Sequence, residues 1–127
     1  MAGNLTNYLE SKLIDHFLGT TTYTKPTTVY VGLFTVTPGE AGGGTEVTGG
    51  SYARQSAAFG AASAGATTNS ANIDFAGMPA ATTVAIGIFD AITSGNMLLY
   101  GALTTNKTTD AGDTLRIATG SLSVSID

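Results

Sequence analysis

The apolar residues of this chain follow a helical spacing only near its start. In "NLTNYLESKLIDHFLG" they recur at every fourth position, namely Leu5, Leu9, Leu13 and Phe17. An apolar stripe with this period is typical of an amphipathic helix that packs against a core. We therefore predict a helix over residues 5–18 with this stripe buried. Asn4 is expected to cap the first turn, and Gly19 to end the helix in the left-handed conformation.

After Gly19 the pattern becomes that of β-strands. "TTVYVGLFTV", residues 27–36, is rich in the β-branched and aromatic side chains that fit a pleated sheet. Residues 37–50 hold a proline and six glycines, which predicts a long loop. Further strands are expected at 52–59, 66–76, 83–90, 96–103, 113–118 and 120–126. Short strands between Gly or Asn turns indicate one mainly β domain over residues 1–127. We predict an antiparallel β-sandwich or jelly-roll-like fold over about 27–127, preceded by the one α-helix.

Alternation within four of these strands predicts which side chains face the core. Ile73 and Phe75 share one face, as do Leu115 and Ile117. In the strand at 83–90 we expect one face to hold Val84, Ile86 and Ile88 and the other to hold Ala85, Gly87 and Phe89. In the last strand we expect Leu122, Val124 and Ile126 to point inward, and the serines to form an exposed polar face at Ser121, Ser123 and Ser125.

Composition narrows the classes of function. Only 11% of the 127 residues are charged, against about a quarter in a typical soluble domain, and the net charge is −4. Five scattered Lys and Arg residues form no basic stripe, so nucleic acid is not an expected partner. We expect no membrane span and no secretion signal. A surface rich in Thr, Ser and Ala favours contact with other proteins over a free monomer, although a small weakly charged domain is the alternative.

The few residues that could carry chemistry do not form a recognisable catalytic set. Asp90 lies between two apolar runs in "GIFDAITSGNMLLYGAL", before the turn-forming residues Ser94, Gly95 and Asn96, so we interpret it as a turn residue. His16 is the single histidine and lies on the polar side of the predicted helix. Because the chain has no cysteine, a thiolate nucleophile and Cys-bound zinc are excluded. We expect no catalytic, cofactor-binding or metal site, and "DAGD", residues 110–113, is predicted to be a turn.

One stretch suggests an interface instead. In "GGSYARQSAAFG", Tyr52 and Arg54 fall on the same face of a predicted strand, and these two residue types are common interface anchors. Arg54 could pair with Glu40 or with Glu46 of the preceding loop. The alternative is an ordinary strand with a solvated arginine. We predict an interface formed by these four residues and the three serines of the last strand.

Five segments together resemble a known family. They are "YLESKLIDHFLG", "YTKPTTVYVGLFT", "PGEAGGGTEVTGGSYARQ", "GIFDAITSGNMLLYGAL" and "GDTLRIATGSLSVSID". In this order they look like small virion surface proteins of tailed bacteriophages, which are labelled phage tail fibre-like and have relatives that act as head decoration, or cement, proteins. The resemblance covers nearly the whole chain and implies a structural, non-enzymatic role on the virus particle.

Two structural roles follow from the resemblance. As a cement protein the chain would bind the major capsid protein and copies of itself, as a homotrimer at a three-fold position of the outer capsid lattice. As a tail fibre or tail tip component it would contact a host receptor, and residues 37–51 would be the first segment to consider. We favour cement, because the chain has one domain and no internal repeat. Either way the resemblance implies a virion protein that would assemble in the bacterial cytoplasm. An enzyme or a carbohydrate-binding module is the remaining alternative.

Overall fold

The computed structural model describes residues 4–126 and contains antiparallel strands and one helix in that range. The elements are β1 (Asn4–Leu5), α1 (Asn7–Phe17), β2 (Val29–Val36), β3 (Thr45–Glu46), β4 (Gln55–Ala57), β5 (Ala66–Thr68), β6 (Ile73–Met78), β7 (Ala81–Phe89), β8 (Met97–Thr109), β9 (Asp113–Ile117) and β10 (Ser123–Ser125). The predicted class, mainly antiparallel β with one N-terminal helix, is confirmed.

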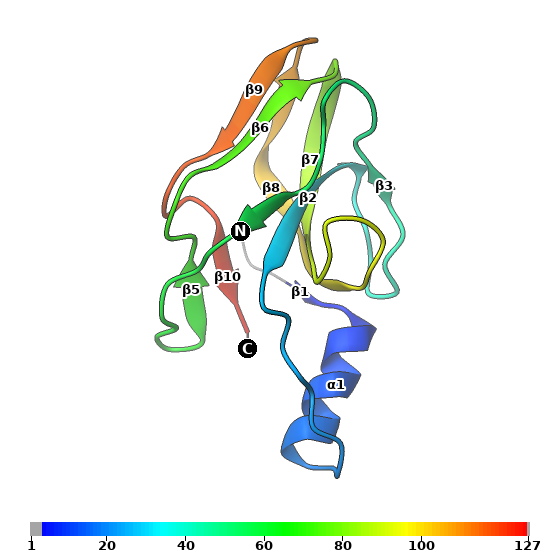
Figure 1. Ribbon diagram of the computed structural model, residues 1–127, viewed down its shortest axis with the longest axis vertical. Coiled ribbons are helices and arrows are strands. Elements are labelled where there is room, and N and C mark those ends of the chain that lie inside the picture. The colour runs from blue at the N-terminus through cyan, green and yellow to red at the C-terminus, as the bar shows by residue number, and fades with distance from the viewer. Residues whose placement is uncertain (1–3, 127) are drawn as a thin grey trace.

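The strands form two layers around one main core. The larger sheet has the order β1-β8-β7-β2-β3, and β4 also pairs with β2. The pairs β6–β9 and β5–β10 lie along one side of this sheet, and α1 extends from one end of the body (Figure 1). Leu33 and Ile86 of the large sheet pack in one cluster with Phe75, Met78 and Leu115 of the β6–β9 pair. Burial of these apolar side chains gives the protein its sandwich-like form.

Several strand boundaries differ from the prediction. The expected strand at 66–76 is divided into β5 and β6 because the buried side chain of Asn69 holds the chain between them. Its Nδ2 donates to the carbonyl oxygens of Ala71 (2.8 Å) and Ala118 (3.0 Å), and its Oδ1 accepts from the Leu122 amide (2.9 Å). The predicted loop at 37–50 contains β3, and β8 continues to Thr109.

The helix begins and ends differently from the sequence prediction. Thr6, not Asn4, is the N-cap: its hydroxyl accepts from the Leu9 amide at 3.4 Å and donates to the Met97 carbonyl at 2.7 Å. Asn4 instead lies in β1, opposite Tyr100 of β8. The C-cap is Leu18 in the right-handed conformation, and Gly19 does not take the left-handed one.

The predicted burial of the whole helical stripe is wrong. Leu9 is buried and Leu5 and Leu13 are partly buried, but 73% of Phe17 is exposed. The reason is that α1 contacts β1 and β8, whereas its last turn extends beyond the body (Figure 1).

Two predicted side-chain directions are also wrong. The register of β7 against β8 shifts between Thr83 and Ala85, and Val84 packs with Ala85 and Phe89 on the outer face instead of with Ile86 in the main core. Where the pairing of two strands is irregular, the alternation expected from a strict two-residue period is interrupted. Ile126 was expected to point inward but is 50% exposed, since it follows the last paired residue of β10.

No helix of residues 4–126 has the length and apolar character needed to cross a membrane.

Candidate functional site

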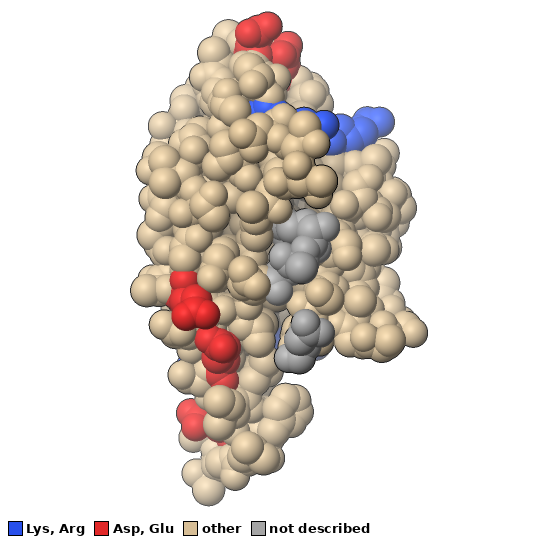
Figure 2. Space-filling model, turned by 180° about the vertical axis from the view of Figure 1, so that it is seen from behind, with Lys and Arg blue, Asp and Glu red and all other residues tan. Residues whose placement is uncertain are grey.

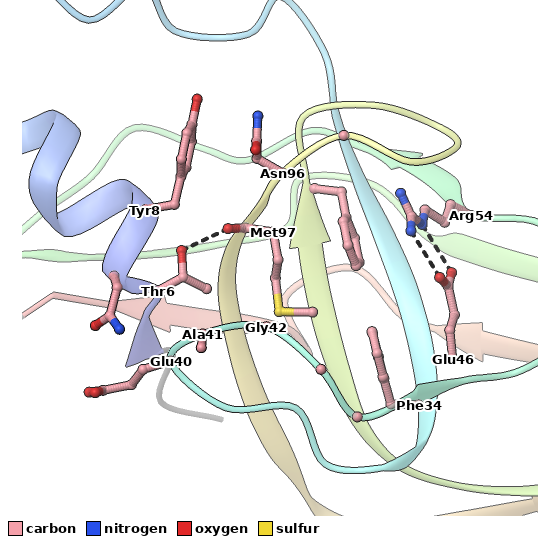
Figure 3. A pocket seen from close by; sticks show the side chains of 15 residues that line it. Thr6, Tyr8, Phe34, Glu40, Ala41, Gly42, Glu46, Arg54, Asn96 and Met97 are labelled. Atoms are coloured by element: carbon pink, nitrogen blue, oxygen red, sulfur yellow. Dashed lines mark hydrogen bonds and ion pairs between the residues drawn. The ribbon is translucent and has the colours of Figure 1, made fainter.

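A hollow on the outer face of the large sheet brings together several of the predicted site residues (Figure 3). Its volume is about 600 Å³, and it is bounded by residues 6–8 at the start of α1, residues 40–44 of the glycine-rich segment and residues 95–97 before β8. Glu40 lies at its exposed rim. The hollow exists because two loops and the helix start meet over one face of the sheet.

The floor of this hollow is a second, smaller apolar cluster. The rings of Phe34 in β2 and Phe89 in β7 are stacked at 6.1 Å between centroids, with Ala85 buried beside them. Val84 and Met97 pack against this cluster and stay partly exposed. An apolar patch on the outer face of a sheet needs a cover, and the surrounding loops supply most of it.

Arg54 ties the loops over this face together. Its Nε and Nη2 donate to the two carboxylate oxygens of Glu46 at 3.0 and 2.9 Å. Its Nη1 donates to the carbonyl oxygens of Ala91 (3.1 Å) and Ser94 (2.8 Å). The guanidinium carbon also lies 3.5 Å from the centroid of the Phe89 ring, a cation–π contact. One side chain therefore links β3, the segment before β4 and the loop between β7 and β8.

Tyr52 adds a third side chain to the Arg54–Glu46 pair. Its hydroxyl donates to Glu46 Oε2 and accepts from the Leu33 amide, both at 2.8 Å. Its ring stacks on Phe75 with 6.0 Å between centroids. Burial raises the pKa of Tyr52 above its usual value, and the hydrogen bond to Glu46 adds to the increase. The phenol thus stays neutral and acts as a donor to the Glu46 carboxylate.

Asp90 closes the loop that Arg54 holds. Its Oδ1 accepts from the Asn96 amide at 2.7 Å, and its Oδ2 accepts from the Asn96 side chain at 3.0 Å. Ser94 and Gly95 both have positive φ, and a Cβ on Gly95 would lie 2.5 Å from Asp90 Oδ1. These contacts agree with the interpretation of Asp90 as a turn residue.

The other candidate residues also make structural contacts. His16 accepts a hydrogen bond from the Tyr23 amide at 3.1 Å. Asp74 pairs with Arg116 at 2.7 Å, and the hydrogen bonds from Arg116 lower the pKa of Asp74. Asp113 accepts from the Asp110 amide at 2.8 Å and closes the predicted turn at 110–113. Within the described range, no three His, Asp or Glu side chains gather as a metal site would require.

The structure brings together only part of the predicted interface. Arg54 pairs with Glu46 and not with Glu40, and both partners use their charged groups within the chain. The serines lie on the other layer: Ser121 is exposed, whereas Ser123 and Ser125 are partly covered in the pairing with β5. Sequence reasoning missed the Phe34–Phe89 floor and the contact of Arg54 with the loop after β7. No local pattern signals either contact, because Phe34 and Phe89 lie far apart in the sequence and Arg54 lies 40 residues from Ser94.

Fold and site together define a mainly β protein whose charged and turn-forming residues fix a set of surface loops. Residues 4–125 match the sequence profile of the Gp80 family, described as podophage GP4 fiber I protein gp80. A search of curated proteins gave no match. Because the match spans nearly the whole chain, the protein belongs to this family and is a phage fibre-type structural protein. The resemblance to virion surface proteins of tailed phages is thereby confirmed.

Proposed function

We propose that this protein is a non-enzymatic subunit of a fibre on a tailed-phage particle and acts through contacts with other proteins. The family match over residues 4–125 carries this proposal. The surface supports it: seen from behind, the molecule is largely uncharged, with acidic groups at the top and in a short row at the lower left and basic groups near the top (Figure 2). Charged residues are depleted in the core of protein–protein interfaces, so a weakly charged surface suits contact with a protein partner.

The site supports a preformed contact surface. The Arg54–Glu46 pair and the Asp90 turn hold the loop after β7 against β3, so that little conformational entropy is lost when this face meets a partner. The hollow beside this pair, with Glu40 and Tyr8 at its edge, is the surface we assign to that contact. In a tail fibre the partner would be a host receptor or the neighbouring fibre subunit.

Capsid decoration is the second candidate. In that role one domain of residues 1–127 would bind the major capsid protein and sister copies as a homotrimer on the outer lattice. The described residues support it by forming one layered body around one main core, without a repeating unit along an axis. A compact unit of this kind suits a position on a lattice.

Cryo-electron microscopy of the intact particle tests both roles. Repeated density for this chain in the tail fibres would establish the fibre role, and density over the capsid lattice would establish decoration. A phage lacking the gene separates the roles in a second way. Loss of adsorption to the host indicates a tail fibre, whereas normal adsorption with loss of DNA on mild heating indicates cement. Absence of the protein from purified particles would refute both.

A further inference from the structure

The last turn of α1 leaves apolar side chains in water. We define the α1 tip as residues 14–18, in which Ile14, Phe17 and Leu18 are 59%, 73% and 85% exposed. The tip extends beyond the body (Figure 1), and its connection back to β2 is held by the His16–Tyr23 hydrogen bond. A cluster of exposed large apolar residues on one projecting element marks an interaction site.

A groove beside the same helix offers a complementary surface. We define the α1 groove as the hollow of about 790 Å³ between residues 23–29, residues 56–59 and residues 71–73. Leu9 of α1 and Leu98 of β8 also line it, so its base is apolar. Among the described residues that line it, Lys25 carries the charge, and this residue is exposed.

We propose that the α1 tip of one copy docks into the α1 groove of a second copy of this chain. The charges identify the occupant: the tip carries the exposed carboxylate of Asp15, and the groove carries the exposed ammonium of Lys25. Residues 4–126 contain two ion pairs, Arg54–Glu46 and Arg116–Asp74, so neither Asp15 nor Lys25 has an ionic partner in that range. A second copy brings an apolar tip and the opposite charge to the groove in one contact.

The position of the groove makes this contact reciprocal. Because Leu9 of α1 lines the groove, tip and groove lie next to each other in every copy. One two-fold rotation can then seat both tips at once, which is the arrangement of an isologous dimer. A single tip is too small to supply the roughly 800 Å² that each partner contributes to a stable interface, and reciprocal docking doubles the contact. The inference rests on the proposed function for the premise that several copies meet on the particle.

Sedimentation of the purified chain over a range of concentrations tests the contact. We expect the wild type to self-associate, and Phe17→Asp to weaken association roughly tenfold or more, as expected for an interface anchor. Asp15→Lys and Lys25→Asp should each weaken it, and the double variant Asp15→Lys/Lys25→Asp should restore it. Val36→Asp is the matched control, because Val36 of β2 is an apolar residue that is 56% exposed and lies outside the tip, the groove and the hollow, and it should leave association unchanged. Thermal unfolding of each variant is measured as well, and a melting temperature equal to that of the wild type shows that the variant is folded.

Cysteine cross-linking locates the contact directly, because the chain has no cysteine of its own. Leu18→Cys protein mixed with a differently tagged Thr27→Cys protein should form a mixed disulfide that Phe17→Asp abolishes. Asp110→Cys should not replace Thr27→Cys, since the β8–β9 turn lies at the end of the molecule opposite α1 (Figure 1). A wild type that stays monomeric at all concentrations overturns the inference, as does cross-linking that is indifferent to Phe17→Asp. The proposed function would fail on a different result, which is the absence of this protein from purified phage particles.

Discussion

Replacing Arg54 by alanine should destabilise the protein strongly, although Arg54 lies in a loop-rich part of the molecule. The substitution removes the two hydrogen bonds from Arg54 to Glu46, the two from Arg54 Nη1 to the loop after β7 and the contact with the Phe89 ring, and leaves Glu46 with the Tyr52 hydroxyl as its donor. The Arg54 and Glu46 side chains are only 10% and 25% exposed, so the carboxylate left behind is poorly solvated.

Two reference cases set the range for the expected loss in the free energy of unfolding. Removing one partner of a fully buried ion pair costs about 3–5 kcal/mol, whereas an exposed pair contributes about 0–1 kcal/mol. Water can reach part of Glu46 once the guanidinium is gone, which favours the lower end of the first range. We therefore expect a loss of about 3 kcal/mol in the free energy of unfolding. For a chain of this length that corresponds to a melting temperature lower by roughly 10 °C.

Urea denaturation followed by circular dichroism measures this difference, since the chain has no tryptophan for fluorescence. Arg116→Ala is the matched control. Arg116 makes a comparable two-point contact with Asp74, at 2.7 and 3.1 Å, but both side chains are well exposed, at 59% and 40%. We expect its unfolding midpoint to equal that of the wild type. Equal midpoints for Arg54→Ala and Arg116→Ala would refute the argument that burial makes the Arg54 contact important.

Three further predictions follow from the core, the helix and the Tyr52 hydroxyl. Thr83 is fully buried, and its hydroxyl has no hydrogen-bond partner in the described range. Thr83→Val should therefore raise the free energy of unfolding by about 1 kcal/mol, and a lower urea midpoint would contradict this. Leu9→Ala should lower the free energy of unfolding by about 2–3 kcal/mol, because Leu9 is buried, whereas Phe17→Ala should leave the thermal unfolding of the monomer unchanged. Similar losses of stability in both variants would be inconsistent with the exposed end of the helix. Burial raises the pKa of Tyr52 in the folded state, so the folded protein keeps the phenol protonated more strongly than the unfolded chain does. The stability that Tyr52 contributes is therefore complete below the unfolded-state pKa of about 10 and is lost as the pH rises above that value. The stability difference between wild type and Tyr52→Phe should therefore narrow from pH 9 to pH 11 in urea titrations, and a constant difference would show that the raised pKa does not contribute.

Features that depend on residues close together in the chain could be predicted from the sequence. The apolar period at the start of the chain predicted α1, and the β-branched run at 27–36 predicted β2. Asp90 was correctly interpreted as a turn residue because an acid followed by Ser, Gly and Asn satisfies backbone groups a few residues away. These are short-range effects, since the groups that interact are separated by a few bonds of the chain.

Which side chains find partners depends on contacts between segments that are far apart in the chain. Thr6 caps α1 instead of Asn4 because β1 pairs with β8 and uses Asn4 in the sheet. Phe17 is exposed because the helix extends past the sheet that covers Leu9, a matter of element length and position that periodicity does not contain. Arg54 binds carbonyl groups 37 and 40 residues away, and no local pattern encodes a contact that arises only when the segment before β4 meets β3 and the loop after β7.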